Sequence, residues 1–214
     1  MSNPPRPIPW HGYYEPLSAA QVYGDSRNAR TGPSPFQSAK YPDLHPLLAV
    51  DTARFKFDVR RKPHEIDAGT WVFSNRHVAA TEAGVKRLRI ISKAFLWTID
   101  IESPVPVTCE AVWEALYYGL QQPIADSEWG LIVSLGRGNG FGSRKQKEVV
   151  ERAAKKRLEE NVGDQVRLRR VDYLGEATVL KGLEKDEEFA ELRLLPGNKR
   201  CRDTWIATFG TACS

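Results

Sequence analysis

The stretch VTCEAVWEALYYGLQQPIADSEW, residues 107–129, decides the fold because it encodes a helix together with both of its ends. Thr108 is placed to cap the helix by accepting a hydrogen bond from a backbone N–H near Ala111, and Pro123 stops it. Apolar residues recur at spacings of three and four, which gives one apolar stripe; they are Val112, Ala115, Leu116, Gly119 and Leu120. We therefore expect a helix over about 108–121 that packs on a sheet.

Segments with the character of strands precede this helix. The runs KRLRIIS (86–92) and FLWTIDIE (95–102) are rich in β-branched and aromatic residues, and apolar and polar residues alternate from Trp97 to Glu102. This alternation has the period of a half-buried strand and fixes its register. A further strand is expected at 55–58, and a short one at 70–73.

After the helix, Asp126 is expected to cap a short helical turn over about 126–133. A flexible Gly-rich loop (136–147) then leads into a charged surface helix (about 144–161). Four strands joined by short turns are expected to form an antiparallel meander, at 165–175, 176–183, 189–195 and 204–210. The predicted fold class is α+β, with an antiparallel sheet of about five to seven strands and one packed helix.

The N-terminal region differs in composition from the rest of the chain. Residues 1–44 are rich in proline and tyrosine and poor in aliphatic residues, a composition that favours a disordered tail. The opening PPRPIPW favours polyproline II and is a candidate recognition peptide, with a plain solvated tail as the alternative. A single domain is expected over residues 45–210, and 41% hydrophobic residues suffice for its core.

The overall composition points to an intracellular protein, cytoplasmic or nuclear. There is no basic start followed by an apolar run, as in a signal peptide, and no uninterrupted apolar run long enough for a membrane span. The three cysteines, Cys109, Cys201 and Cys213, are an odd and widely spaced set, so free thiols are expected.

The net charge of +4 is concentrated in one region, where residues 143–170 hold ten basic and five acidic side chains. A local basic excess can neutralise phosphates, so this segment is a candidate for binding nucleic acid or another anionic surface. The candidate anion-binding residues are Arg144, Lys145, Lys147, Lys155, Lys156, Arg169 and Arg170. The alternative is a solvent-facing helix laced with both charges, without the exposed aromatic residues that stack on single strands.

Residue patterns that would indicate catalysis or a cofactor are incomplete. The loop GRGNGFG (136–142) lacks the lysine of a phosphate loop and the third glycine of a dinucleotide site, so no cofactor is predicted. No histidine pair has the spacing of a metal site, and no metal is predicted. An enzyme with a cryptic site would need a deep pocket that holds His64 or His77 beside Cys109 or an acidic residue. A buried structural thiol is the alternative role of Cys109. Asp172 is expected to pair with a neighbouring arginine across the sheet.

Three aromatic residues lie partly off the apolar stripe of the 108–121 helix. Trp113, Tyr117 and Tyr118 could leave aromatic surface exposed for a partner, or a further layer of structure could cover them. We therefore expect a non-catalytic protein-interaction module that binds another protein, or a second copy of itself, through this surface or a sheet edge. Nucleic-acid binding and a cryptic enzyme are the two alternatives.

Several short motifs also occur in a recognisable order over most of residues 45–183. They are HPLL (45–48), FDVR (57–60), LRI (88–90), Trp97, VTCEAVWEAL (107–116), DSEW (126–129) and RRVDYLG (169–175). Their order and spacing resemble a domain family of unknown function that is abundant in mushroom-forming basidiomycete fungi. The resemblance implies no activity, because that family has no established catalytic or binding residue to carry over. The Gly-rich loop and the helix after it are longer than the resemblance implies.

Overall fold

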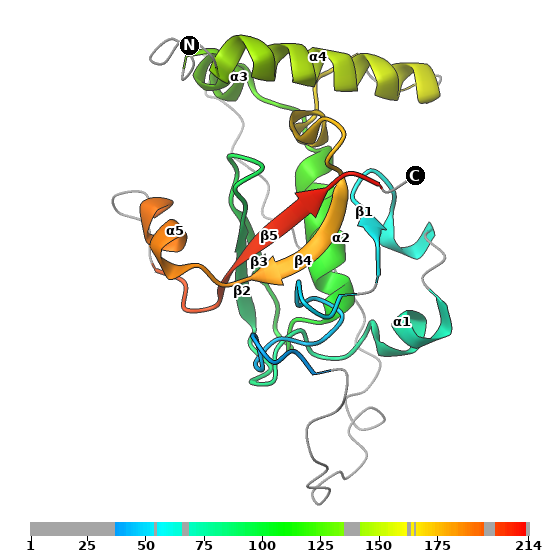
Figure 1. Cartoon of the computed structure of the whole chain (residues 1–214), viewed down its shortest axis with the longest axis vertical. Helices are drawn as coiled ribbons and strands as arrows, with labels where there is room; N and C mark the ends of the chain where they lie inside the picture. Colours follow the sequence, from blue (N-terminus) through cyan, green and yellow to red (C-terminus); the bar gives the residue numbers. More distant parts are fainter. Residues whose placement is uncertain are drawn as a thin grey trace, which may run out of the picture. The chain divides into compact units, whose positions relative to one another are not determined.

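The structure is a computed structural model that describes residues 37–53, 55–65, 69–134, 142–161, 164, 166–194 and 200–212 (Figure 1). In chain order the elements are β1 (Phe57–Asp58), the 3-10 turn η2 (Pro63–Glu65), α1 (Gly69–Asn75), β2 (Arg87–Ile91), β3 (Ile99–Glu102), α2 (Cys109–Gln121), α3 (Asp126–Ser134), α4 (Gly142–Glu160), the 3-10 turn η3 (Arg170–Leu174), β4 (Val179–Glu184), α5 (Glu187–Leu192) and β5 (Thr204–Gly210). Residues 1–36 of the predicted disordered tail (1–44) and residues 136–141 of the predicted flexible loop (136–147) lie outside the described residues.

The five strands form one sheet in the order β1-β4-β5-β2-β3. Three of the four pairings are antiparallel, whereas β2 and β5 run parallel. The α+β class and the strand number are therefore confirmed, but a purely antiparallel sheet was wrong. The physical reason is that two antiparallel pairs, β2–β3 and β4–β5, join side by side, and the strands that meet at this junction point the same way.

Helix α2 packs on the sheet through the predicted apolar stripe, and Figure 1 shows it behind β4 and β5. Val112, Leu116 and Leu120 are fully buried. Thr108 caps the helix as expected, since its side chain accepts a hydrogen bond from the N–H of Ala111 at 3.2 Å. A Cβ at Gly119 would lie 3.0 Å from Cδ1 of Ile99, so glycine allows α2 to approach β3 closely.

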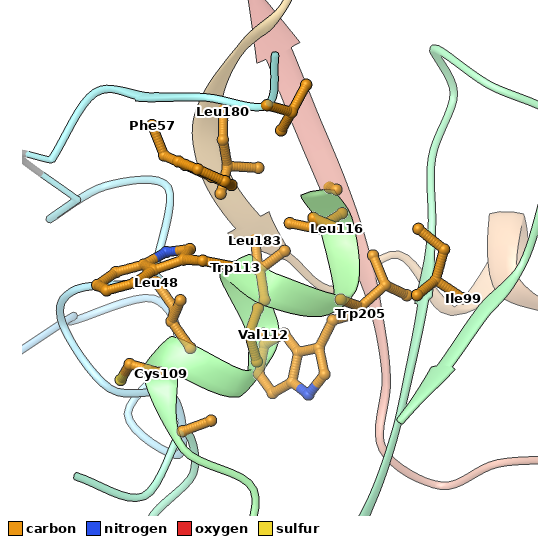
Figure 2. Close-up of a cluster of buried hydrophobic side chains, with 14 of the residues drawn as sticks. Leu48, Phe57, Ile99, Cys109, Val112, Trp113, Leu116, Leu180, Leu183 and Trp205 are labelled. Carbon is orange, nitrogen blue, oxygen red and sulfur yellow. The ribbon is translucent and has the colours of Figure 1, made fainter. Parts of the chain in front are cut away.

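The core extends beyond α2 and the sheet to the segment that precedes β1. Figure 2 shows Leu48 in the same cluster as Val112, Leu183 and Trp205. Leu44 is 1% exposed, so the packed domain begins before the expected boundary at residue 45. The backbone of the segment before β1 also bonds to β4: the N–H of Leu183 donates to the carbonyl oxygen of Leu48 at 2.6 Å.

Three segments predicted as strands contain helical structure among their described residues. Residues 70–73 lie in α1. The segment 165–175 contains η3, and the first residues of the segment 189–195 belong to α5. The turn η3 forms because the carboxylate of Asp172 accepts the backbone N–H of Arg169 at 2.8 Å and closes the backbone locally. Similarly, Asp186 caps α5 by accepting the N–H of Phe189 at 3.0 Å.

Helices α3 and α4 lie against η3 at one end of α2. The cap of α3 differs from the prediction, because Glu128 rather than Asp126 accepts a backbone N–H, that of Ala125, at 2.9 Å. Helix α4 starts at Gly142, so the last residues of the predicted loop are helical. Helix α4 is a charged surface helix as predicted, and it packs inward along one face, where Val150 and Ala154 are buried. Within the described residues, no helix is both long and apolar enough to cross a bilayer.

Candidate functional site

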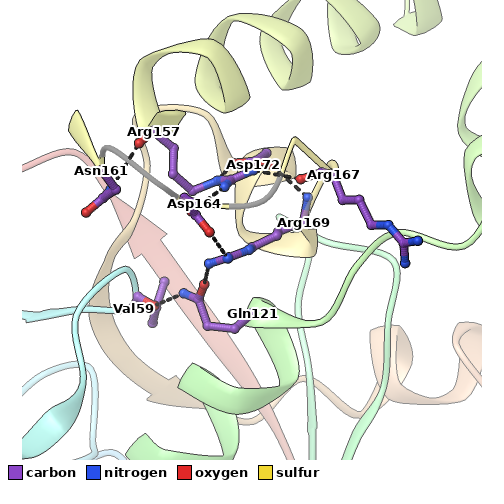
Figure 3. A network of polar contacts seen from close by, with 8 residues as sticks. All are labelled: Val59, Gln121, Arg157, Asn161, Asp164, Arg167, Arg169 and Asp172. Carbon is purple, nitrogen blue, oxygen red and sulfur yellow. Dashed lines mark hydrogen bonds and ion pairs between the residues drawn. The ribbon is translucent and has the colours of Figure 1, made fainter. Parts of the chain in front are cut away.

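A network of polar side chains gathers where α4, η3 and α2 meet (Figure 3). Arg157 of α4 donates two hydrogen bonds to Asp172 of η3, Nε to Oδ1 at 2.9 Å and Nη2 to Oδ2 at 3.0 Å. It also donates to a carboxylate oxygen of Asp164 at 2.6 Å and to the carbonyl oxygen of Arg167 at 2.8 Å. Arg157 is 8% and Asp172 3% exposed, so this ion pair is buried. Asp172 thus pairs with an arginine from a helix, not across the sheet.

The same network continues through Arg169 to the C-terminal end of α2. Its Nη1 donates to the side-chain oxygen of Gln121 at 3.0 Å, and its guanidinium pairs with Asp164. The side-chain NH₂ of Gln121 in turn donates to the carbonyl oxygen of Val59 at 3.2 Å. The side chains of Arg157 and Arg169 therefore link α4, η3, α2 and the residue after β1. Their guanidinium N–H groups donate to acceptors within the protein.

Arg170 is also held by the protein. Its Nη2 donates to Glu128 of α3 at 2.6 Å, and its guanidinium carbon lies 5.1 Å from the ring centroid of Trp97. Partial burial opposes the charged form of Glu128, but the N–H of Ala125 and the guanidinium of Arg170 outweigh this and lower its pKa. This contact fixes α3 to η3.

The remaining members of the candidate anion-binding set lie on α4. Lys145, Lys147, Lys155 and Lys156 are exposed, whereas the side chain of Arg144 lies outside the described residues. Lys147 pairs with Glu151 at 3.7 Å and Lys155 with Glu159 at 3.9 Å. The predicted set is thus divided into two groups: arginines that face inward, and exposed lysines that alternate with acidic residues. Among the described residues, these two groups form no continuous basic surface.

The candidate aromatic surface is mostly covered. Trp113 is 3% exposed, with its ring centroid 4.8 Å from that of Phe55 and 6.4 Å from that of Phe57. β1 and the residues before it cover this flank of α2, so the ring of Trp113 packs inside the protein. Tyr117 is half-buried against the core, and Tyr118 is 39% exposed.

The two histidines proposed for a cryptic catalytic site lie on open surface and not in a deep pocket. Cys109 is buried, and desolvation raises the pKa of its thiol to about 12, which favours the unreactive neutral form. The imidazole Nδ1 of His77 lies 2.8 Å from a carboxylate oxygen of Glu110, but the His77 side chain is 64% exposed on open surface. His64 is similarly exposed, at 60%.

Cys109 should accordingly resist alkylation in the native protein. With a pKa of about 12, its thiolate is scarce at mildly alkaline pH, and the thiolate is the nucleophile. Native treatment with iodoacetamide followed by peptide mass spectrometry should label the half-exposed Cys201 but leave Cys109 unmodified. Labelling of Cys109 should appear only when the protein is denatured first. Equal native labelling of both thiols would contradict the buried position of Cys109.

Surface hollows of the described structure lie beside α4 and beside α5. A groove of about 380 Å³ lies between α4 and residues 166–168, lined by Ala154, Leu158 and Val166 among others. A smaller hollow of about 90 Å³ lies between α5 and the sheet. Among the described residues, no three histidine, cysteine or acidic side chains come close enough together to hold a metal ion.

The outer edge of β3 presents unpaired backbone groups. Pairing with β2 matches Leu88 with Ile101 and Arg89 with Asp100, and the N–H of Ser103 donates to the carbonyl oxygen of Lys86 at 2.9 Å. Bonded and non-bonded pairs alternate along an antiparallel ladder, so Ile101 faces β2 with both backbone groups. The N–H and C=O of Asp100 and Glu102 therefore point away from β2, and no described backbone group bonds to them.

Comparison with protein families matches residues 55–189 to one described as "Family of unknown function (DUF6699)". This match covers more than half of the 214-residue chain. The chain belongs to DUF6699. Neither the search of curated proteins nor that of solved structures found a match.

The DUF6699 match contains the buried ion pair, α2 and the β3 edge, but it does not contain every strand of the sheet. It ends within α5, before β5 (Thr204–Gly210). β5 is nevertheless central, because it pairs with both β4 and β2. Trp205 of β5 is 1% exposed and packs in the core, so residues beyond the match complete the DUF6699 sheet in this protein.

Proposed function

We propose that this DUF6699 protein is a non-catalytic protein-interaction module that binds an extended segment of a partner protein along the outer edge of β3. The observation that carries this proposal is the outward direction of the N–H and C=O groups of Asp100 and Glu102. Unpaired edge groups are a template for adding a strand, and main-chain hydrogen bonds then supply affinity.

The two edges of the sheet are not equivalent. β1 has only two residues, and its Asp58 is engaged by the guanidinium of Arg60 at 2.7 Å. β3 has four residues, and its Asp100 and Glu102 are exposed. A short edge strand offers few hydrogen bonds to an added strand, so β3 is the better docking edge.

Helix α2 adds apolar surface close to β3. A Cβ at Gly119 would lie 3.0 Å from Ile99 of β3, so this point of the helix is close to the strand, and Ala111 and Ala115 lie on the same line of the helix at spacings of four. Both alanines are only half-buried although they pack against the core. These small side chains support the proposal, because they leave room for apolar side chains of a docked segment.

The proposed setting is the inside of the cell. Cys109 and Cys201 are both free thiols, which fits a reducing compartment. A reducing compartment would preserve both thiols during function. Fractionation of native cells followed by immunodetection should place the protein in the cytoplasm or nucleus, and recovery from the secreted fraction would contradict this part of the proposal.

Asp100→Pro should weaken partner binding by about 1 to 3 kcal/mol, or roughly 5- to 150-fold, because it removes an outward N–H and leaves a partner carbonyl unsatisfied. Proline is tolerated on an edge strand where its missing N–H would face solvent, so the fold should persist. The measurement is quantitative affinity capture from native lysate with the wild-type protein and this variant.

Asp100→Ala is the matched control for that experiment, because it removes the same carboxylate but keeps the N–H. Partners that dock on the edge should be recovered in clearly larger amounts by Asp100→Ala than by Asp100→Pro, because both variants lose the carboxylate but only the proline variant also loses the N–H. Thermal unfolding checks that both variants are folded. Equal recovery of every partner by the proline and alanine variants would rule out docking on β3.

A further inference from the structure

One face of the β2–β3 pair carries a ladder of opposite charges. Arg89 of β2 pairs with Asp100 of β3 at 2.6 Å, and Arg87 pairs with Glu102 at 3.0 Å. The acidic side chains occupy the outer strand, and they remain 48% and 67% exposed. A strand added at this edge would thus place its own side chains next to a row of carboxylates, with the arginines one strand further away.

This charge order makes a second copy of the chain a poor occupant of the edge. If two β3 strands paired antiparallel about Ile101, Asp100 of one copy would lie opposite Glu102 of the other. Like charges directly opposite each other across strands destabilise the pairing. The edge therefore discourages pairing with itself while its backbone groups remain available to another sequence.

The opposite face of the edge has a different chemistry. Ile99 is 8% exposed and Ile101 is half-buried, and both belong to or pack against the core beneath α2. Because successive side chains of a strand point to opposite faces, a docked segment would direct every second residue toward this apolar side. The half-buried Ala111 and Ala115 are small, so branched apolar residues would fit next to them.

From these two faces we infer that the partner segment is a basic β-strand, in which lysine or arginine alternates with apolar residues. Its cations would lie beside Asp100 and Glu102 and extend the ladder to three strands, with arginine on β2, carboxylates on β3 and cations on the partner. Its apolar residues would face α2. This inference rests on the proposed docking of a partner at β3 and specifies the chemistry of that partner.

Fluorescein-labelled short peptides provide the test with the full-length protein. One peptide alternates lysine with valine, a second alternates glutamate with valine, and a third has the lysines and valines of the first in two separate blocks. In fluorescence-anisotropy titrations at low salt, the alternating lysine peptide should bind at least about five- to tenfold more tightly than either other peptide.

Two charge-reversal variants distinguish binding at the β3 edge from general electrostatic attraction to the protein. Glu102→Lys should weaken binding of the alternating lysine peptide about five- to tenfold. Glu159→Lys on α4 is the matched control and should leave binding unchanged, because Glu159 is about as exposed as Glu102, at 65% against 67%, and is likewise paired with a basic side chain. Equal effects of the two reversals, or no binding of the lysine peptide at millimolar concentration, would overturn the inference.

The same titrations distinguish failure of the inference from failure of the proposed function. If the glutamate peptide binds more tightly and Asp100→Pro abolishes that binding, edge docking stands and the basic partner is wrong. If Asp100→Pro and Asp100→Ala bind the lysine peptide equally, docking at the edge itself is wrong. A dimer seen by light scattering that Asp100→Pro dissociates would show that the occupant is a second copy, which also overturns the basic partner.

Discussion

Replacing Asp172 with alanine is expected to lower the free energy of unfolding by about 3 to 5 kcal/mol. The substitution leaves the guanidinium of Arg157, 8% exposed, without the carboxylate that now binds two of its nitrogens. It also removes the acceptor of the Arg169 backbone N–H that closes η3. A buried guanidinium that loses one of its two carboxylate partners costs more than a lost surface ion pair, so the effect should be large.

Urea denaturation followed by circular dichroism measures this change. Glu159→Ala is the control, because the Lys155–Glu159 pair is exposed on the same helix as Arg157 and should contribute less than about 0.5 kcal/mol. Adding Arg157→Met to Asp172→Ala should restore part of the lost stability, since the double variant no longer buries the guanidinium that lost one of its carboxylate partners. A loss below about 1 kcal/mol for Asp172→Ala would show that the buried pair does not hold α4 to η3.

Truncation of Leu116 to alanine is the second variant with a large expected effect, about 2 to 5 kcal/mol of destabilisation. Leu116 is fully buried at the centre of the helix stripe that contacts the sheet. Interiors are close-packed, so removing its branched end leaves a cavity that the surrounding core can fill only in part.

The matched control makes the same chemical change on the surface. Leu192 of α5 is 83% exposed, so Leu192→Ala should change stability by less than about 0.5 kcal/mol. Both variants are compared with the wild-type protein by thermal and urea unfolding. Similar losses for the two variants would mean that α2 does not form the centre of the core.

The parts of the fold that the sequence predicted well are those in which local pattern and tertiary packing agree. The helix expected over 108–121 is observed as Cys109–Gln121, and the stripe through Leu116 faces the sheet. The alternation before Glu102 predicted β3, where Ile99 faces the core and Asp100 faces solvent. The last strand, Thr204–Gly210, was also placed correctly.

The errors concern segments whose structure depends on side chains from elsewhere in the chain. RRVDYLG has the residues of a strand, but Asp172 closes a turn and pairs with Arg157, a contact between residues fifteen positions apart. A local signal did exist for α5, because Asp186 followed by two glutamates is typical of a helix start. The parallel pairing of β5 with β2 joins distant residues and has no signature in either strand alone.

The candidate sites were harder to predict than the fold. Composition identified the basic segment but could not show that Arg169 and Arg170 turn inward, because their partners Gln121 and Glu128 lie on other helices. Helical spacing placed Trp113 at the flank of the apolar stripe, and only the position of β1 decides that it is covered. Partner binding at a sheet edge was proposed without naming the strand, because the order of strands in a sheet cannot be derived from the residue pattern of each strand.

Residue-resolved amide hydrogen exchange measured by NMR tests the central claim, the open outer edge of β3, most directly. The structure predicts alternating rates along this strand: slow exchange at Ile99 and Ile101, whose N–H groups face β2, and fast exchange at Asp100 and Glu102, whose N–H groups face solvent. Slow exchange at all four residues in the isolated protein would contradict the account, because it would mean that the edge is already paired.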